Sequence, residues 1–585
     1  MLNLITDHLD VWASAELPAK TGGIGRAASN GKSPHGIQKL RELILELAVR
    51  GKLVPQDAND EPASELLKKI AKEKVRLSKL GLIKNKKAPP EIQNEEEPFD
   101  LPEGWEWARF PSVCDYMPGK TPSTKNPVFW SDRGEGFPWI SISDMEHFGL
   151  IRESAKHITQ KASDQVFKHD PISAGSLLMS FKLTVGKIAI LDVDAYHNEA
   201  IISIQPFTGI SRDYLFKFLP TRALAGNTKR AIMGNTLNAT SLSLLLIPVP
   251  PIAEQHRIVA KVDELMALCD QLEQEQTDNS NVHQILVETL LATLTQADSD
   301  GEFTAAWQRI AEHFDTLFTT EQSIDQLKQI ILQLAVMGKL VPQDPNDELA
   351  SELLKIIAAE KFRLIKEKKI KKQVPLPVIS DDEKPYVLPA SWAWIRVWDV
   401  AELITSGSRD WAKYYSDDGA IFVTMGNLSR DSYKLRLDSI RYVMPPLDGE
   451  GARTKLEADD LLISITGDVG NLGLIPNDFG DAYINQHTCL LRFITCCRTK
   501  YFPELMRSTL AKKQFNAPQR GVKNSFRLGD VGEMIIPLPP LAEQDRIAAK
   551  VDELMAICDE LKARLNETKI TQVQLADAIV EQAVA

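Results

Sequence analysis

Short clusters of lysine, arginine, asparagine, serine and threonine lie beside glycines in two stretches of this chain. These side chains suit contacts to phosphates and to the edges of DNA bases, because arginine pairs with guanine and asparagine with adenine. A solvated charged turn is the alternative for any one cluster, so the prediction depends on their recurrence at equivalent positions. The candidate DNA-binding residues are Lys120, Thr121, Lys182, Lys187, Lys229, Arg230, Asn235, Thr236, Ser408, Arg409, Arg520, Lys523, Asn524 and Arg527.

The clusters belong to two copies of one long unit. The segment Leu47-Ala-Val-Arg-Gly-Lys-Leu-Val-Pro-Gln-Asp57 recurs, with one substitution, at 334–344. The segment Pro250-Pro-Ile-Ala-Glu-Gln255 recurs as Pro539-Pro-Leu-Ala-Glu-Gln544. Between these blocks the copies diverge, which favours two domains that share a scaffold but address different ligands. Drift after duplication is the alternative.

Motifs for catalysis are missing from the sequence. Gly119-Lys-Thr is not a phosphate-binding loop, because the earlier glycine that this loop requires is replaced by Cys114. There is no dinucleotide loop after a strand, no Asn-Pro-Pro-aromatic motif for amino methylation and no His-Glu-x-x-His. His487 suggests a catalytic base, but its counterpart in the first copy is Ala200. We therefore expect no catalytic residue and no metal site, and a structural or DNA-contacting role for His487.

Long amphipathic helices are predicted after each proline pair, because apolar residues alternate in steps of four and three as in a coiled coil. The polar stretch 277–281 is a candidate interruption of the first helix. Two further helix patterns end at Gly51 and Gly338, where glycine commonly follows a helix. The residues predicted to pack helices or partners are Ile258, Val262, Leu265, Leu272, Ile547, Val551, Leu554 and Leu561.

Short β-rich runs separated by glycine, aspartate and proline turns predict compact mixed α/β domains between the helices. A Trp-x-Trp sequence marks the entry to each domain, and packing at the domain edge explains it better than base stacking. The fold class is therefore α+β, with two mixed α/β domains separated by long antiparallel coiled-coil helices and an internal pseudo-two-fold duplication. The predicted division is a helical region and linker at 1–100, a first domain at 101–250, a helical spacer and linker at 251–387, a second domain at 388–539 and a helix at 540–585.

The net charge of −12 argues at first against nucleic acid. However, residues 101–250 hold 15 Lys+Arg against 14 Asp+Glu, and residues 388–539 hold 18 against 18. Domains this close to neutrality can carry a basic face, and the acidic helices fit protein partners better. The six cysteines form no C-x-x-C pair, and the sequence shows no signal peptide and no long apolar run. We expect reduced thiols and a cytoplasmic protein.

The proline pair followed by Ala-Glu-Gln-x-Arg-Ile and a coiled coil, present twice, resembles the specificity subunits of type I restriction-modification enzymes. Each copy follows a variable domain, and Gly-Lys-Leu-Val-Pro-Gln-Asp at 51–57 and 338–344 matches the family's conserved region before that domain. The resemblance covers nearly the whole chain. The N-terminus departs from it through an insert of about 18 residues before Ile37.

The resemblance implies that each variable domain is a target-recognition domain that reads one half of a split DNA site. The helices would set the gap between the halves, near one helical turn or ~34 Å. Two methyltransferase subunits would dock on the helices, bind S-adenosylmethionine and methylate adenine N6, while restriction subunits would use ATP and Mg²⁺ to cleave foreign DNA. The chain itself would bind no cofactor and no membrane.

Two other interpretations remain open at this point. One is a stand-alone duplicated coiled-coil scaffold or DNA-binding regulator that never meets a methyltransferase. The other is an enzyme that uses unrecognised carboxylates or His487. Neighbouring genes for an N6-adenine methyltransferase and an ATP-dependent endonuclease would favour the specificity subunit over both.

Overall fold

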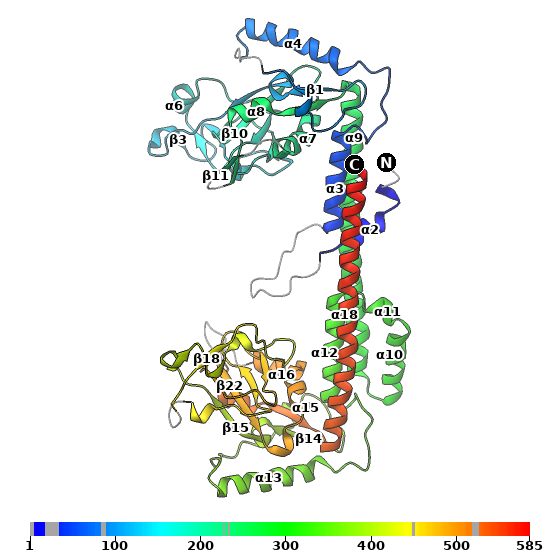
Figure 1. Ribbon diagram of the computed structural model, residues 1–585, viewed down its shortest axis with the longest axis vertical. Coiled ribbons are helices and arrows are strands. Elements are labelled where there is room, and N and C mark those ends of the chain that lie inside the picture. The colour runs from blue at the N-terminus through cyan, green and yellow to red at the C-terminus, as the bar shows by residue number, and fades with distance from the viewer. Residues whose placement is uncertain are drawn as a thin grey trace. The chain divides into compact units, whose positions relative to one another are not determined.

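The computed structural model describes residues 5–17, 34–83, 89–225, 229–231, 234–446, 451–517 and 526–584. The chain divides into two compact units: unit 1 is Met1–Asn279 with Thr568–Ala585, and unit 2 is Ser280–Glu567. Each unit contains one β-rich domain and helices from both copies of the repeat (Figure 1). In the described part of the chain, every helix is too short or too polar to cross a membrane.

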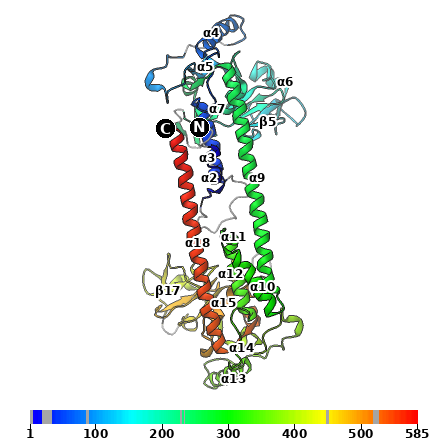
Figure 2. The ribbon, with the colours of Figure 1, turned by 90° about the vertical axis from the view of Figure 1, so that its right-hand side faces the viewer.

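Two long helices follow the two proline pairs. They are α9 (Ile252–Gln296) and α18 (Leu541–Val584). Figure 2 shows α9 as one helix, so the polar stretch 277–281 does not interrupt it. The first half of each long helix belongs to the unit of the domain that precedes it, and the second half belongs to the other unit.

In unit 1, α3 (His35–Val49) packs beside the last turns of α18. The Nε2 atom of His35 lies 3.4 Å from a carboxylate oxygen of Asp577. Arg50, which follows α3, donates to the carbonyl oxygen of Val584 at 2.9 Å. The start of α3 thus lies beside Asp577, and its end lies beside Val584, which comes later in α18. The two segments therefore run in the same direction.

The same helix α3 runs opposite to the first half of α9. Arg41 in α3 contacts Asp270 at 2.8 Å, whereas Gln56, beyond the end of α3, bonds to Glu254 near the start of α9 at 2.8 Å. The α9 and α18 segments of unit 1 are therefore antiparallel, as predicted. Unit 1 also contains α2 (Leu9–Ser14) and α4 (Ala63–Lys79).

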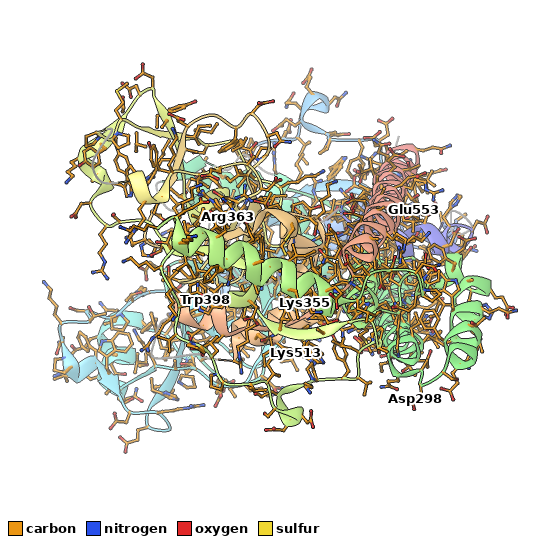
Figure 3. All side chains as sticks on the ribbon, turned by 90° about the horizontal axis from the view of Figure 1, so that it is seen from below. Asp298, Lys355, Arg363, Trp398, Lys513 and Glu553 are labelled. Carbon is orange, nitrogen blue, oxygen red and sulfur yellow. The ribbon has the colours of Figure 1, made fainter. Side chains whose placement is uncertain are left out.

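Unit 2 repeats this arrangement around α12 (Glu321–Met337). Lys562 of α18 pairs with Asp325 at 2.8 Å, near the start of α12, and the later Lys328 pairs with the earlier Asp559. Gln326 bonds to Glu288 of α9 at 2.8 Å. The other helices of this region are α10 (Asp300–Glu312), α11 (Phe314–Leu317) and α13 (Ala350–Lys366), and Figure 3 looks onto α13, with Lys355 and Arg363 labelled.

The predicted coiled-coil seams face the cores of the two units. Ile258, Val262 and Leu265 are buried in the core of unit 1, and Leu272 packs against its margin. In unit 2, Ile547 and Val551 are buried, while Leu554 and Leu561 are partly buried beside them. All eight residues thus lie on a buried or partly buried face of their helix, because the apolar stripe of an amphipathic helix is the face that leaves water.

The β-rich domain of unit 1 is built from two sheets and a closing strand pair. The closing pair is β1 (Glu106–Arg109) with β13 (Leu246–Val249). The larger sheet has the order β2 (Cys114–Pro118), β10 (Ile201–Pro206), β7 (Leu177–Ser180), β8 (Ile188–Leu191), β5 (Gly149–Ile151). The smaller sheet has the order β3 (Trp130–Ser131), β6 (His157–Ile158), β4 (Phe137–Ile140), β9 (Tyr196–His197). Helices α5 (Phe110–Val113), α6 (Gln160–Ala162), α7 (Arg212–Ala225) and α8 (Ala239–Leu244) connect them, and β11 (Lys229–Ala231) pairs with β12 (Gly234–Thr236).

The β-rich domain of unit 2 has nearly the same strand order, but one of its sheets ends in an antiparallel bridge where unit 1 has the parallel strand β5. Its closing pair is β14 (Ala393–Arg396) with β23 (Ile535–Leu538). One sheet has the order β15 (Ala401–Ser406), β22 (Thr488–Phe493), β19 (Leu461–Ser464), β20 (Leu472–Leu474), and the other β16 (Tyr415–Ser416), β18 (Arg441–Val443), β17 (Ala420–Val423), β21 (Ala482–Ile484). The bridge between Ser429 and Leu472 stands where unit 1 has β5. The helices are α14 (Val397–Val400), α15 (Tyr501–Arg507), α16 (Thr509–Asn516) and α17 (Leu528–Glu533).

Candidate nucleic-acid interface

A buried carboxylate joins the domain of unit 1 to its helix. Glu254, in the first turn of α9, is 1 % exposed and accepts hydrogen bonds from the Trp105 indole at 2.9 Å and the Gln56 amide at 2.8 Å. Burial raises the pKa of the Glu254 carboxyl, and these two donors oppose the rise. One turn later Arg257 pairs with Asp60 at 2.7 Å. We call this set of five residues the junction of unit 1.

Unit 2 has the same junction in the same residue types. Glu543 accepts from the Trp392 indole at 2.8 Å and from the Gln343 amide at 2.5 Å, and Arg546 pairs with Asp347 at 2.5 Å. The Ala-Glu-Gln-x-Arg motif and the Val-Pro-Gln-Asp motif therefore recur because they bond to each other. The packing interpretation of the first tryptophan in each Trp-x-Trp is confirmed, since Trp105 and Trp392 are buried.

The glutamine of each Ala-Glu-Gln motif ties the helix to the rest of the domain. Gln255 accepts from the backbone N–H of Ser211 at 2.8 Å, and Gln544 accepts from the hydroxyl of Thr499 at 3.0 Å. Both amides also donate to the carbonyl oxygen of the first proline of the pair. Since the partners precede α7 and α15, each β-rich domain is held firmly on the start of its own long helix.

Three loops of the first domain converge at one end of the larger sheet. Phe181, in the loop between β7 and β8, donates its N–H to the carbonyl oxygen of Ala200 at 2.9 Å. Leu237, directly after β12, donates to Phe181 at 2.8 Å, and Gly119, directly after β2, donates to Ile201 at 3.1 Å. We call the surface formed by residues 119–121, 181–187 and 198–200 the loop surface of unit 1.

The second domain brings the equivalent loops together. Ile465 donates to His487 at 3.0 Å, Phe526 donates to Ile465 at 2.9 Å, and Gly407 donates to Asn485 at 3.1 Å. The loop surface of unit 2 consists of residues 407–409, 465–471 and 485–487. A β-carbon on Gly119 would lie 2.0 Å from the carbonyl oxygen of His197, and one on Gly407 would lie 1.9 Å from that of Ile484. Glycine is required at both positions because the loop passes so close to the strand.

A buried serine shapes the central loop in each unit. Ser180 and Ser464 are fully buried at the ends of β7 and β19. The Ser180 hydroxyl accepts from the backbone N–H of Lys187 at 3.1 Å, and the Ser464 hydroxyl accepts from that of Asn471 at 2.8 Å. Each hydroxyl also donates to a carbonyl oxygen within its loop. The backbone of the central loop is thus the same in both units.

The candidate residues of the first domain are only partly gathered on the loop surface. Lys120 and Thr121 lie on it and are exposed, and Lys182 lies over the ring of Phe181 at 5.1 Å. Lys187 instead turns its ammonium to the carbonyl oxygen of Ile142 at 3.2 Å, away from the loop tip. Four candidates lie on the β11–β12 hairpin, whose backbone alone is described: Lys229, Arg230, Asn235 and Thr236.

In the second domain, Ser408 and Arg409 follow β15 on the loop surface, and Arg409 is exposed. Arg527 is exposed where α17 begins, next to Phe526. Arg520, Lys523 and Asn524 lie outside the described residues. Within the ranges that the structure describes, no group of acidic, histidine and cysteine side chains is arranged to hold a metal ion.

The loop surfaces also contain two residues that were not predicted as contacts, Glu199 and Gln486, and His487, for which the sequence suggested a structural or DNA-contacting role. Glu199 accepts a hydrogen bond from the hydroxyl of Thr121. In unit 2 the imidazole of His487 contacts the Thr466 hydroxyl and the Gln486 amide, each at 2.8 Å. The signal in the sequence was the Ala-Tyr-x-Asn repeat at 195–198 and 482–485, because these residues come directly after it.

The sequence and the fold can be compared with known proteins. The family model described as "Type I restriction modification DNA specificity domain" matches residues 102–280 and 389–571. The chain is 38 % identical over 606 aligned residues to the EcoAI specificity subunit of Escherichia coli, and 37 % over 620 to the EcoEI specificity subunit of the same species. Both alignments cover 99 % of this chain and 99 % of the relative. A crystal structure of the HsdS subunit from Thermoanaerobacter tengcongensis is 19 % identical, with a TM-score of 0.39 over 83 % of this chain and 98 % of that one.

Proposed function

Because the chain belongs to the specificity subunits of type I restriction-modification systems, we propose that each loop surface reads one half of a bipartite DNA site. The supporting observation is the repeated construction of the two domains. In each, a rigid junction fixes the domain to a helix, and three polar loops meet at one end of a sheet. A surface built twice on the same backbone, with different side chains, suits two different DNA half-sites.

In this proposal the chain carries no catalytic step. The helices set the distance between the half-sites and dock two methyltransferase subunits, which bind S-adenosylmethionine and methylate adenine N6. Restriction subunits join the same cytoplasmic complex and cleave unmethylated foreign DNA with ATP and Mg²⁺. Six of the predicted contact residues are described as exposed or half-buried on the two loop surfaces or beside them: Lys120, Thr121, Lys182, Ser408, Arg409 and Arg527.

Single-molecule methylome sequencing tests the proposal. Cells expressing this chain with its cognate methyltransferase subunits are compared with cells that lack the chain. We expect N6-methyladenine at one bipartite motif, only where the chain is present. Replacing the first β-rich domain by that of a relative with a known site should change one half of the motif and leave the other half intact.

Absence of any new motif, with the assembled complex shown by gel filtration, would instead support a stand-alone scaffold or regulator. An unchanged motif after the domain replacement would contradict the assignment of one half-site to each domain. N6-methyladenine made by the purified chain alone would contradict its non-catalytic role.

A further inference from the structure

One turn of the backbone carries a different polar residue in each unit. The turn follows β9 in unit 1 and β21 in unit 2, and it places Glu199 and Gln486 at the same position. In both units the preceding asparagine side chain accepts the N–H of the residue that follows, Ala200 at 3.0 Å and His487 at 3.1 Å. This asparagine turn fixes the backbone, so the two side chains leave the loop surface from equivalent points.

Glu199 is exposed at the centre of the unit 1 loop surface. Its Oε2 atom accepts from the hydroxyl of Thr121. Among the residues that the structure describes, no hydrogen-bond donor is recorded for its Oε1 atom. A carboxylate that keeps one free oxygen can accept a hydrogen bond from an amino group but can offer none.

Gln486 is held by a directed chain of hydrogen bonds. Its Nε2 atom can only donate, so the Nε2 atom of His487, 2.8 Å away, accepts. The proton of His487 is therefore on Nδ1 and is donated to the Thr466 hydroxyl at 2.8 Å, which itself donates to the sulfur of Met425 at 3.7 Å. This chain leaves the Oε1 atom and the second N–H of Gln486 for an outside partner.

The charge of the flanking residues also differs between the two units. Around the charged Glu199, the flanking loops carry Lys120 and Lys182. Around the neutral Gln486, Ser408 and Thr466 occupy the equivalent positions. A carboxylate near DNA phosphates is repelled unless cations lie beside it, whereas a carboxamide needs no such balance. The ammonium of Lys120 donates to the carbonyl oxygens of Val166 and Phe167, so Lys182 is the flanking lysine left to balance an acidic side chain at this position.

We propose that the residue at this position reads one base edge in each half-site. Glu199 accepts a hydrogen bond from the N4 amino group of a cytosine, and the Gln486 carboxamide bonds to N6 and N7 of an adenine in the major groove. His487 is a positioning residue, because it acts through the Gln486 amide. This inference rests on the proposed function and specifies which residue discriminates within each half-site.

The test uses the full chain assembled with its methyltransferase subunits. Methylomes are compared for the wild type, E199Q and Q486E, after the wild-type motif has been determined. We expect each substitution to change one base position in one half-site and to leave the other half-site unchanged, so each variant is the matched control for the other. Binding to duplexes substituted at every motif position then measures the discrimination, which should fall from about tenfold or more to near onefold at that position alone.

H487A should change the same base position of the motif as Q486E does, because the Gln486 amide loses the hydrogen bond that fixes its orientation. An unchanged motif and unchanged discrimination in E199Q and Q486E would overturn the inference and leave the proposed function intact. An equal loss of affinity for every duplex would also overturn it, since that is the behaviour of a phosphate contact. By contrast, a wild-type chain that yields no bipartite motif would remove the proposed function itself.

Discussion

The junctions and the loop surfaces of the two units have diverged to different extents. The junctions use the same five residue types, from Gln56 and Trp105 in unit 1 to Gln343 and Trp392 in unit 2. The loop surfaces keep the backbone hydrogen bonds of the central loop, from Phe181 to Ala200 in unit 1 and from Ile465 to His487 in unit 2, but exchange the outward side chains. A buried carboxylate with two donors tolerates no exchange of partners, because an unpaired charge in the interior is costly. An exposed turn whose shape depends on a buried serine and a glycine leaves its surface side chains free to change.

The largest effect should come from removing the junction tryptophans. W105A and W392A each delete a large buried ring and leave a carboxylate without one donor, so each should cost about 3 to 5 kcal/mol of stability. We expect the midpoint temperature of unfolding of the affected unit, measured by scanning calorimetry, to fall by a similar amount in both variants. W398A, a partly buried tryptophan outside the junctions, is the comparison variant.

A loss below about 1 kcal/mol in either junction variant, less than the range for buried tryptophans, would break the equivalence of the two junctions. A large loss in only one of them would show that one unit keeps its helix by other contacts.

The buried serines should give the next largest effect. S180A and S464A each leave a backbone N–H, that of Lys187 or Asn471, without its acceptor, at a cost of about 1 to 3 kcal/mol. Faster hydrogen exchange of the affected loop should accompany reduced methylation. S243A is the control in unit 1, because Ser243 is a half-buried serine in α8 whose hydroxyl donates to the carbonyl oxygen of Thr240, within its own helix. Unchanged exchange at Lys187 in S180A would contradict the assigned role of the hydroxyl.

The charge difference between the loop surfaces predicts an effect on the salt dependence of DNA binding, smaller than the effects on stability above. If Lys182 neutralises one phosphate, K182A should lower the slope of log affinity against log salt by about 0.9 and weaken binding to all duplexes alike. The equivalent change in unit 2, T466A, should leave the slope unchanged. Titration of the purified methyltransferase complex with its duplex at several salt concentrations measures both. Equal slopes in K182A and the wild type would place Lys182 off the phosphates.

The smallest expected effect is a dependence of stability on pH. Burial raises the pKa of Glu254 and Glu543 in the folded protein, so the folded state holds their protons to higher pH than the unfolded state. The contribution of these groups to stability therefore falls as pH rises from their ordinary range through the raised pKa, and then levels off. E254Q should lack the part of this slope that Glu254 contributes, and E543Q the part that Glu543 contributes, so each variant should show a shallower slope than the wild type in chemical unfolding between about pH 4 and pH 8. If the free energy of unfolding depended on pH identically in the variants and the wild type, the assigned contribution of the two carboxyls would be contradicted.

Much of the fold was predictable from local patterns. The seam from Ile258 to Leu272 predicted an amphipathic helix because its period is written in neighbouring residues, and the structure confirms its burial. The duplication, the antiparallel helices and the mixed α/β domains were also predicted. The polar stretch 277–281 was wrongly considered a break, because intrinsic propensity is a weak signal within a long helix.

The site was predictable only in part. The residue types and their recurrence identified Lys182 and Arg409, but the inward direction of Lys187 depends on a contact with Ile142, 45 residues away. Glu199 and Gln486 were missed because the repeated Ala-Tyr-x-Asn motif ends just before them and their own residue types differ between the copies. Their importance follows from the loops that surround them, which come from separate strands.

The sequence by itself determined which segments are duplicated, which faces of the helices are apolar and which family the motifs resemble. Each of these is a property of adjacent or regularly spaced residues. Only the tertiary structure decided that Glu254 meets Trp105, 149 residues away, and that three separate loops form one surface. The reason is physical: hydrogen bonds between distant segments depend on how the whole chain packs, and no local periodicity encodes that packing.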